Sequence, residues 1–213
     1  MPSVVSSSAN SRANLPRSAL LRICDSLIEK TFLVLRKFKP ARERVTIGEF
    51  NDHVEHEHLA RYNFALRYCE RKKVADIACG TGYGAELLRS VARSVDCFDK
   101  EALCGNRTID LEKESWQDCY DVIVSFETIE HLANPEFFLT GAHRTTKLLI
   151  VSTPIGEFKG YNPHHKQVWT LSEFRAFVER YFECEYYFQK GPEILDSPPD
   201  TIRFVIAVGV PKP

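Results

Sequence analysis

Apolar and polar positions follow different periods in different parts of the chain. Over residues 18–38, apolar side chains recur at helical spacing, which predicts an amphipathic helix that ends before Pro40. A second helical pattern covers about 56–70. Residues 1–17 are rich in serine and asparagine and poor in apolar side chains, which is typical of a disordered tail. The N-terminal part is therefore expected to be a tail followed by helices.

Short apolar runs then alternate with helical patterns. The expected strands cover 74–78, 94–99, 107–110, 121–125, 147–152, 184–189 and 202–210, and the expected helices cover 85–93, 135–144 and 170–181. Pro135 suits a first helical turn, and Thr170 or Ser172 is expected to cap the last helix. This order predicts an α/β fold with a mainly parallel sheet, closed by an antiparallel hairpin because only a loop separates the last two strands. The expected domains are the tail 1–17, the amphipathic helix 18–42 and one α/β domain at 43–213.

Composition and charge narrow the class of protein. The chain has 213 residues, 44% hydrophobic and 27% charged, with a net charge of −1. This balance weighs against a nucleic-acid partner, which usually needs a basic surface, and favours a small-molecule or glycan substrate. The seven cysteines include no CxxC pair, which favours buried reduced thiols over disulfides or zinc.

The sequence shows no pattern of a membrane span or of a secretory signal. No apolar run is long enough to span a membrane, and the N-terminus has no signal-peptide pattern, so we expect a cytoplasmic protein. Basic residues lie among the apolar ones of 18–38. This helix is expected to pack on its own domain, with docking to a membrane surface or a partner protein as the alternative.

The strongest chemical signal is the run DIACGTGYG at 76–84. Gly80 and Gly82 let the backbone turn sharply and approach a ligand. Asp76, on the preceding strand, can accept a hydrogen bond from a ligand ammonium group. Asp99 ends the next strand, 19 positions after Gly80, where an acidic side chain meets a ribose diol. A dinucleotide-binding Rossmann unit is the competing interpretation, but its usual GxGxxG spacing differs from the GxGxG found here.

With an acid on the strand before GxGxG, the chain resembles class I S-adenosylmethionine-dependent methyltransferases. The resemblance covers roughly residues 43–210. The resemblance implies a seven-stranded Rossmann-like methyltransferase sheet and S-adenosylmethionine as cofactor. It implies cofactor contacts from Arg61, Asp76, Ala78, Cys79, Gly80, Gly82, Asp99, Asp110, Leu111 and Phe126. Asp110 matches the acid that meets the adenine amine, and Arg61 is expected to pair with the cofactor carboxylate. Residues 100–106 allow one helical turn at most, where the family has a full helix.

A second constellation follows the fourth and fifth expected strands. Glu127, Glu130 and His131 come after the fourth, and His165 follows the fifth. Because the carboxyl ends of parallel strands share one edge, these side chains should converge near the methyl group of the cofactor. They fit a divalent metal site, for Mg²⁺ or Mn²⁺. The alternatives are a catalytic role for His165, His131 and Glu127 as general bases or orienting groups, and a structural network.

The ExxEH pattern resembles ubiquinone-pathway O-methyltransferases and small-RNA 2′-O-methyltransferases, which use it for a metal. The wider pattern FETIEHL…NP…STP…NPxH also resembles methyltransferases encoded with glycan-assembly genes. Since a hydroxyl is a poor nucleophile that needs a base or a metal, the expected reaction is O-methylation of a sugar on a glycan or nucleotide-sugar. The alternatives are a small-RNA 2′-O-methyltransferase and a non-catalytic methyltransferase-like subunit that binds a partner through 18–38.

Overall fold

The computed structural model describes residues 52–102, 105–114 and 116–213. The tail expected at 1–17 and the helix expected at 18–42 lie outside the described residues, as does the start of the domain expected at 43–213. No helix in the described part of the chain combines the length and apolar character needed to cross a membrane.

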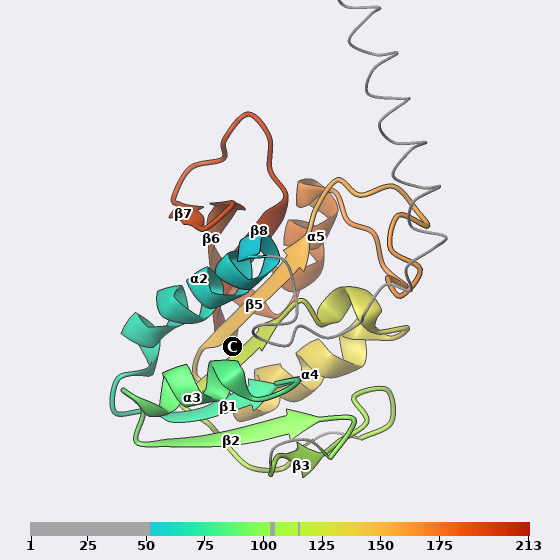
Figure 1. Cartoon of the computed structure of the whole chain (residues 1–213). Coiled ribbons are helices and arrows are strands. Elements are labelled where there is room, and N and C mark those ends of the chain that lie inside the picture. The colour runs from blue at the N-terminus through green and yellow to red at the C-terminus, as the bar shows by residue number, and fades with distance from the viewer. Residues whose placement is uncertain (1–51, 103–104, 115) are drawn as a thin grey trace, which may run out of the picture. The chain divides into compact units, whose positions relative to one another are not determined.

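Eight strands form one sheet in the order β3-β2-β1-β4-β5-β8-β6-β7 (Figure 1). Their bounds are β1 Lys73–Ile77, β2 Ser94–Asp99, β3 Arg107–Thr108, β4 Val122–Phe126, β5 Leu149–Pro154, β6 Phe182–Lys190, β7 Glu193–Leu195 and β8 Phe204–Pro211. Strands β1 to β5 run parallel, while β8 lies antiparallel between β5 and β6. The predicted mainly parallel sheet with an antiparallel C-terminal pair is confirmed.

The strand count of seven was one too low. The additional strand β7 lies in the predicted loop and pairs antiparallel with the end of β6. Gly191, at φ 58°, supports the tight turn between them, because glycine adopts this left-handed backbone without a Cβ penalty. At three residues, β7 is too short to show a period of alternating side chains.

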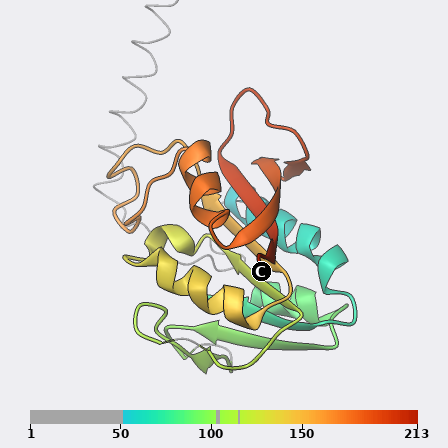
Figure 2. The same cartoon turned by 180° about the vertical axis from the view of Figure 1, so that it is seen from behind.

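Helices cover both faces of the sheet. They are α2 Asp52–Cys69, α3 Tyr83–Arg89, α4 Pro135–Thr145 and α5 Leu171–Val178, with a short 3-10 helix η1 at Ile129–His131. Helices α2 and α3 lie on the face toward the viewer in Figure 1, and α4 and α5 on the opposite face, which Figure 2 shows from behind. Pro135 stands in the first turn of α4, as predicted. Of the two predicted caps, Thr170 and Ser172, it is Thr170 that caps α5, in a reciprocal capping box with Glu173.

Two hydrophobic cores result, one on each side of the sheet. On β4, Val122 and Val124 pack in the core that includes residues of α2 and α3, while Ile123 packs in the core that includes residues of α4 and α5. Side chains of a strand alternate between faces, so a strand buried on both sides reads as a continuous apolar run. This explains why β4 could be recognised in the sequence.

Candidate active site

A cavity of about 670 Å³ lies at the carboxyl ends of the central strands. Its walls include Val54, His58, Tyr62, Ala78, Cys79, Gly80, Tyr83, Asp99, Asp110, Leu111, Phe126, Glu127, Glu130, His131, Glu157, Asn162, His164, His165 and Phe204. Small-molecule sites typically measure about 300–1,000 Å³. The cavity lies where the strand order reverses between β1 and β4, as expected for this class of sheet.

Gly80 and Gly82 have different roles in the glycine turn after β1. Gly80 lines the cavity at φ 56°, and a Cβ built there would meet no atom within 4 Å. Gly82, at φ 82°, caps α3 and is not among the cavity-lining residues. Ala78, which also lines the cavity, holds a left-handed backbone at φ 61°. Gly80 thus leaves space for a ligand, while Gly82 turns the chain into the helix.

Gly84, the third glycine of the motif, makes room for a side chain of α2. A Cβ on Gly84 would lie 2.0 Å from Cζ of Tyr62, a residue of α2 that lines the cavity. The Tyr62 hydroxyl donates to Asp76 Oδ1 over 3.2 Å. Burial raises the pKa of Asp76 to about 8. Asp76 is therefore covered by Tyr62 and is not among the cavity-lining residues.

Asp99 supports the glycine turn directly. Its Oδ2 accepts from the Gly80 backbone N–H over 2.9 Å, and its Oδ1 accepts from Glu101 N over 3.2 Å. Asp99 is only 4% exposed, yet it lines the cavity. The predicted ribose-binding acid therefore lies at the wall and braces the loop beside it.

The predicted adenine-side residues also reach the wall. Asp110 and Leu111 both line the cavity. A hydrogen bond from the Glu112 backbone N–H to Asp110 lowers the pKa of that carboxyl. No helix forms among the described residues of 100–106, of which 103 and 104 lie outside the described part.

Two further predicted cofactor contacts differ in position. Phe126 lines the cavity and packs against the edge of Tyr62, with ring centroids 5.0 Å apart. Arg61 is fully buried and is not among the lining residues. Its Nη1 donates to Gln189 Oε1 over 2.5 Å, while Nε and Nη2 have no hydrogen-bond partner among the described residues. Phe126 can contact a ligand directly, whereas Arg61 stands behind the lining residues.

Glu130 and His131 lie together on η1, the helical turn after β4. Glu130 Oε2 accepts from Thr153 Oγ1 over 3.2 Å, while Oε1 has no hydrogen-bond partner in the described part of the chain. Burial and the nearby Glu127 carboxylate raise the pKa of Glu130 well above its ordinary value. His131 Nδ1 lies 3.2 Å from the His164 carbonyl oxygen, which can only accept. That bond places the proton on Nδ1 and leaves Nε2, 3.9 Å from Glu130 Oε1, as the basic nitrogen.

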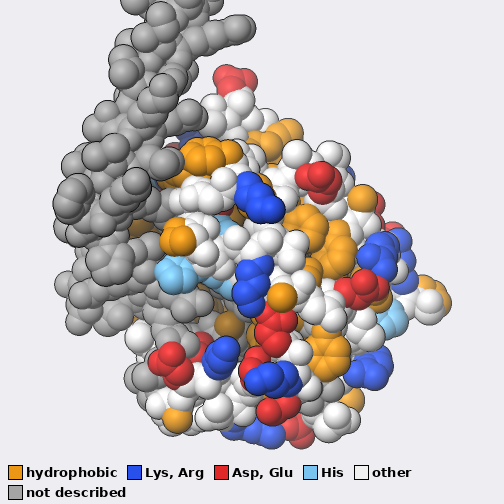
Figure 3. Space-filling view, turned by 90° about the vertical axis from the view of Figure 1, so that its right-hand side faces the viewer, with side chains coloured by type: hydrophobic (Ala, Val, Ile, Leu, Met, Phe, Trp, Pro, Cys, Tyr) orange, Lys and Arg blue, Asp and Glu red, His pale blue; other side chains and the backbone are white. Residues whose placement is uncertain are grey.

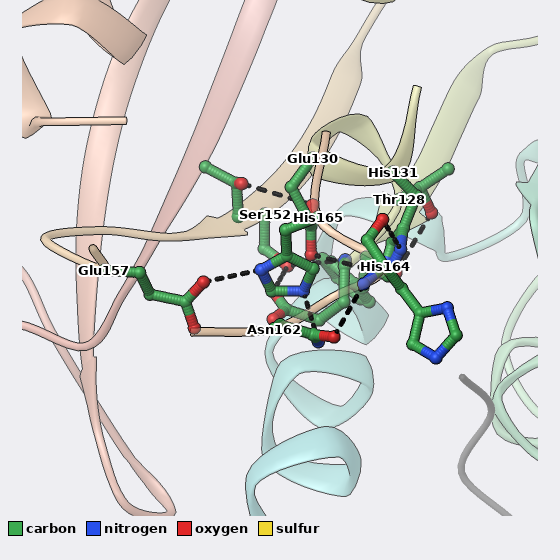
Figure 4. Close-up of polar contacts among 11 residues, drawn as sticks. Thr128, Glu130, His131, Ser152, Glu157, Asn162, His164 and His165 are labelled. Carbon is green, nitrogen blue, oxygen red and sulfur yellow. Dashed lines mark hydrogen bonds and ion pairs between the residues drawn. The ribbon is translucent and has the colours of Figure 1, made fainter. Parts of the chain in front are cut away.

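His165 is held on both ring nitrogens (Figure 4). Nδ1 lies 2.5 Å from Glu157 Oε2, and Nε2 lies 2.8 Å from Asn162 Nδ2. Because the amide nitrogen of Asn162 can only donate, Nε2 accepts from the amide and Nδ1 is the donor to Glu157. Glu157 had no signal in the sequence beyond its place in the loop after β5, whereas Asn162 begins the NPxH pattern, which assigned it no role of its own.

Three of the four predicted metal-site residues come together. Potential ligand atoms of Glu130, His131 and His165 lie within 4.8 Å of one another. Glu127 lines the same cavity but stays outside this group, and its Oε1 accepts from Ser152 Oγ over 2.7 Å. Burial raises the pKa of Glu127 as well. One buried carboxylate and two imidazoles thus form a compact group that can move a proton or bind a cation.

The surface around the carboxyl ends of the central strands carries both basic and acidic side chains. Figure 3 views the molecule from the right-hand side of Figure 1, and basic and acidic side chains are interspersed over the described residues seen there. Lys166 and Glu112, both of which line the cavity, form one such pair with 2.8 Å between Nζ and Oε1.

The fold and the cavity define a Rossmann-like α/β protein with a small-molecule site at the switch in strand order. Residues 50–186 match the methyltransferase domain family, and the chain belongs to that family.

Similar proteins agree with this assignment. A Mycobacterium tuberculosis protein named "Probable S-adenosylmethionine-dependent methyltransferase" is 32% identical over 142 residues, covering 57% of this chain and 52% of that protein. The chain spans about half the length of the curated relatives it matches. A TehB-like SAM-dependent methyltransferase from Corynebacterium glutamicum has a TM-score of 0.56 at 22% identity, covering 72% of this chain and 86% of that one. The small RNA methyltransferase HEN1 has a TM-score of 0.57 at 18% identity, covering 82% and 27%. These two structures show a shared fold.

Proposed function

We propose that this chain binds S-adenosylmethionine in the cavity and transfers its methyl group to a hydroxyl, on a sugar of a glycan or nucleotide-sugar. Family membership and the names of the relatives support the cofactor. The open space at Gly80 and the carboxylate of Asp99 beside it suit the amino acid and ribose parts of that molecule.

The observation that carries the hydroxyl acceptor is the cluster of Glu130, His131 and His165 in the wall of this cavity. A hydroxyl holds its proton at neutral pH and must lose it as the carbon–oxygen bond forms. An unprotonated amine needs no such help. A buried group of acid and imidazole beside the cofactor space therefore fits an oxygen nucleophile best.

His165 is the residue best placed to take the proton. The Glu157 carboxylate holds a proton on Nδ1, so the lone pair of Nε2 is the basic site. Asn162 now donates to that lone pair and would be displaced by an acceptor hydroxyl. The Glu157 contact orients the ring and stabilises the imidazolium that forms.

A divalent cation is the alternative to His165 as the base, because Nε2 of His165 cannot bind a cation and accept the proton at the same time. The donor set fits, because Glu130 Oε1 is a buried carboxylate oxygen without a hydrogen-bond partner among the described residues. Two imidazoles with one carboxylate suit Mn²⁺ or Co²⁺ better than Mg²⁺, which prefers oxygen ligands. His165 would bind through Nε2 while Glu157 stays on Nδ1, a common outer-shell arrangement. A bound cation would supply Lewis acidity that eases loss of the hydroxyl proton.

Calorimetric titration with S-adenosylmethionine tests the cofactor. Absence of binding by the folded protein would favour a non-catalytic subunit. Transfer of labelled methyl groups is then measured on nucleotide-sugars, oligosaccharides and small RNA. The mixed charge in Figure 3 favours the first two, since an RNA path needs a basic stripe. Methylation of RNA alone would overturn the sugar acceptor.

The metal is tested on chelator-stripped protein. Mn²⁺ or Co²⁺ should restore turnover, and His165→Ala should abolish the response. His143→Ala is a suitable control, because His143 lies in α4 outside the cavity and bonds the Lys212 carbonyl. Full turnover in excess chelator would reject the cation and leave His165 as the base, with His165→Gln expected to lose activity.

A further inference from the structure

Two cysteines lie side by side behind the glycine turn. Cys79 belongs to that turn and lines the cavity, and Cys97 lies on the neighbouring strand β2. They share a small buried cluster with Ala85. The backbone N–H of Cys79 donates to the Phe98 carbonyl over 2.9 Å, which fixes the two segments against each other.

The environment makes the pair unequal. Arg89 Nη2 donates a hydrogen bond to the Cys97 sulfur over 3.2 Å. The neighbouring Cys79 thiol and the Arg89 charge lower the pKa of Cys97, against the opposing effect of burial. The neighbouring Cys97 sulfur and burial raise the pKa of Cys79. The pair is therefore polarised, with the thiolate, the reactive form, favoured at Cys97 and the proton kept on Cys79.

We infer that Cys79 and Cys97 form a redox-active dithiol, which a hydroperoxide converts to a disulfide that weakens ligand binding at the cofactor site. The Cys97 thiolate attacks one peroxide oxygen, the O–O bond breaks, and a sulfenic acid forms as hydroxide leaves and becomes water. Cys79 then loses its proton and attacks the Cys97 sulfur. The S–O bond breaks, and the second oxygen leaves as water. Two thiols are oxidised, and one hydrogen peroxide is reduced to two waters.

The disulfide would alter the cavity because of where Cys79 lies. A bonded pair of sulfurs is about 2.05 Å apart, closer than any hydrogen-bonded pair, so the turn must shift toward β2. The next residue is Gly80, whose N–H is held by Asp99 at the cavity wall. The loss of ligand affinity rests on the proposed cofactor site, whereas formation of the disulfide does not.

The test begins with the reduced chain and hydrogen peroxide. After alkylation of remaining thiols, peptide mapping should show a Cys79–Cys97 disulfide, and the affinity for S-adenosylmethionine should fall about tenfold, or 1.4 kcal/mol. A thiol reductant should restore both. Bound S-adenosylmethionine should slow the reaction, because it covers the wall at Cys79. Pairing of other cysteines, or sulfinic acid at Cys97 without a disulfide, would overturn the inference.

Matched variants separate this dithiol from general oxidation. Cys97→Ser should bind the cofactor normally and resist peroxide, because Cys97 is not among the cavity-lining residues. Cys119→Ser, at an exposed cysteine, should keep the full response. Arg89→Gln should slow disulfide formation, which gives a second measurement if Cys97→Ser does not fold. A disulfide that forms while the reduced protein binds no cofactor would sink the proposed cofactor site and leave the dithiol standing.

Discussion

Replacement of Gly84 by alanine tests how helix α2 closes over the glycine turn. The new Cβ would lie 2.0, 2.2 and 2.4 Å from three ring atoms of Tyr62. Carbon atoms in contact need about 3.5–4.0 Å, so the ring must move by about 1.5 Å or more. Tyr62 is 4% exposed and packs edge-on against Tyr83 and Phe126, which leaves little room for that movement.

The cost can be worked from these contacts. Overpacking of a filled core destabilises by about 1–3 kcal/mol. The hydrogen bond from Tyr62 to Asp76 would be stretched or lost, at about 0.5–1.5 kcal/mol. Alanine in place of glycine in a helix offsets up to about 1 kcal/mol. With the full offset, we expect a net loss of about 0.5–3.5 kcal/mol in the free energy of unfolding, and weaker binding of the cofactor because Tyr62 lines the cavity.

Urea unfolding followed by circular dichroism measures the free energy of unfolding, and calorimetry measures cofactor affinity. The decisive comparison is Gly84→Ala in a Tyr62→Ala background, where the clashing ring is gone. There the substitution should be neutral or slightly stabilising. An equal loss of stability in both backgrounds would show that some other contact requires the glycine.

Three further predictions concern the same cavity. Asp99→Ala should weaken S-adenosylmethionine binding by about 1–3 kcal/mol in a titration, and Asp99→Glu should also bind worse; parental affinity in both would leave Asp99 as a brace for Gly80 only. Burial raises the pKa of Asp76 from 3.8 to about 8, so the folded chain keeps a proton that the unfolded chain releases. The protonated Asp76 carboxyl therefore stabilises the fold fully below about pH 4, and this stabilisation is lost as the pH rises through about 8. Asp76→Asn should remove this pH dependence of the free energy of unfolding. An unchanged pH dependence in the variant would contradict the assignment. Glu157→Gln should lower kcat by about tenfold to a hundredfold with little change in cofactor affinity, and an equal loss in both would indicate a merely structural role.

Local patterns predicted the central strands well because these strands are buried on both faces. Strands β4 and β5 read as continuous apolar runs, and all their residues are buried. The capping residue Thr170 and the first-turn residue Pro135 could be predicted because helix ends have strict chemical requirements. The position of the cavity followed from topology alone. Such features depend on neighbours in sequence or on the strand order.

Side-chain partners could not be predicted in the same way. Arg61 meets Gln189, which is 128 positions away, and no local pattern encodes that pairing. The GxGxG spacing does not reveal that Gly84 makes room for Tyr62, because that contact depends on the packing of α2. Glu157 carries no motif of its own, yet it orients His165. These contacts arise only when distant segments meet.

Backbone geometry at the carboxyl ends of β1 and β4 shows how the fold prepares the site. Ala78 and Glu127 follow these two strands with φ of 61° and 53°, although a Cβ in this region costs about 1–2 kcal/mol. Buried hydroxyls from the next strand hold both ends. Ser125 on β4 donates to the carbonyl of Ile77 over 3.0 Å, and Ser152 on β5 bonds both the N–H and the carboxylate of Glu127. Because neighbouring strands maintain these conformations, the cavity wall is formed before a ligand arrives, which lowers the reorganisation that binding and chemistry require.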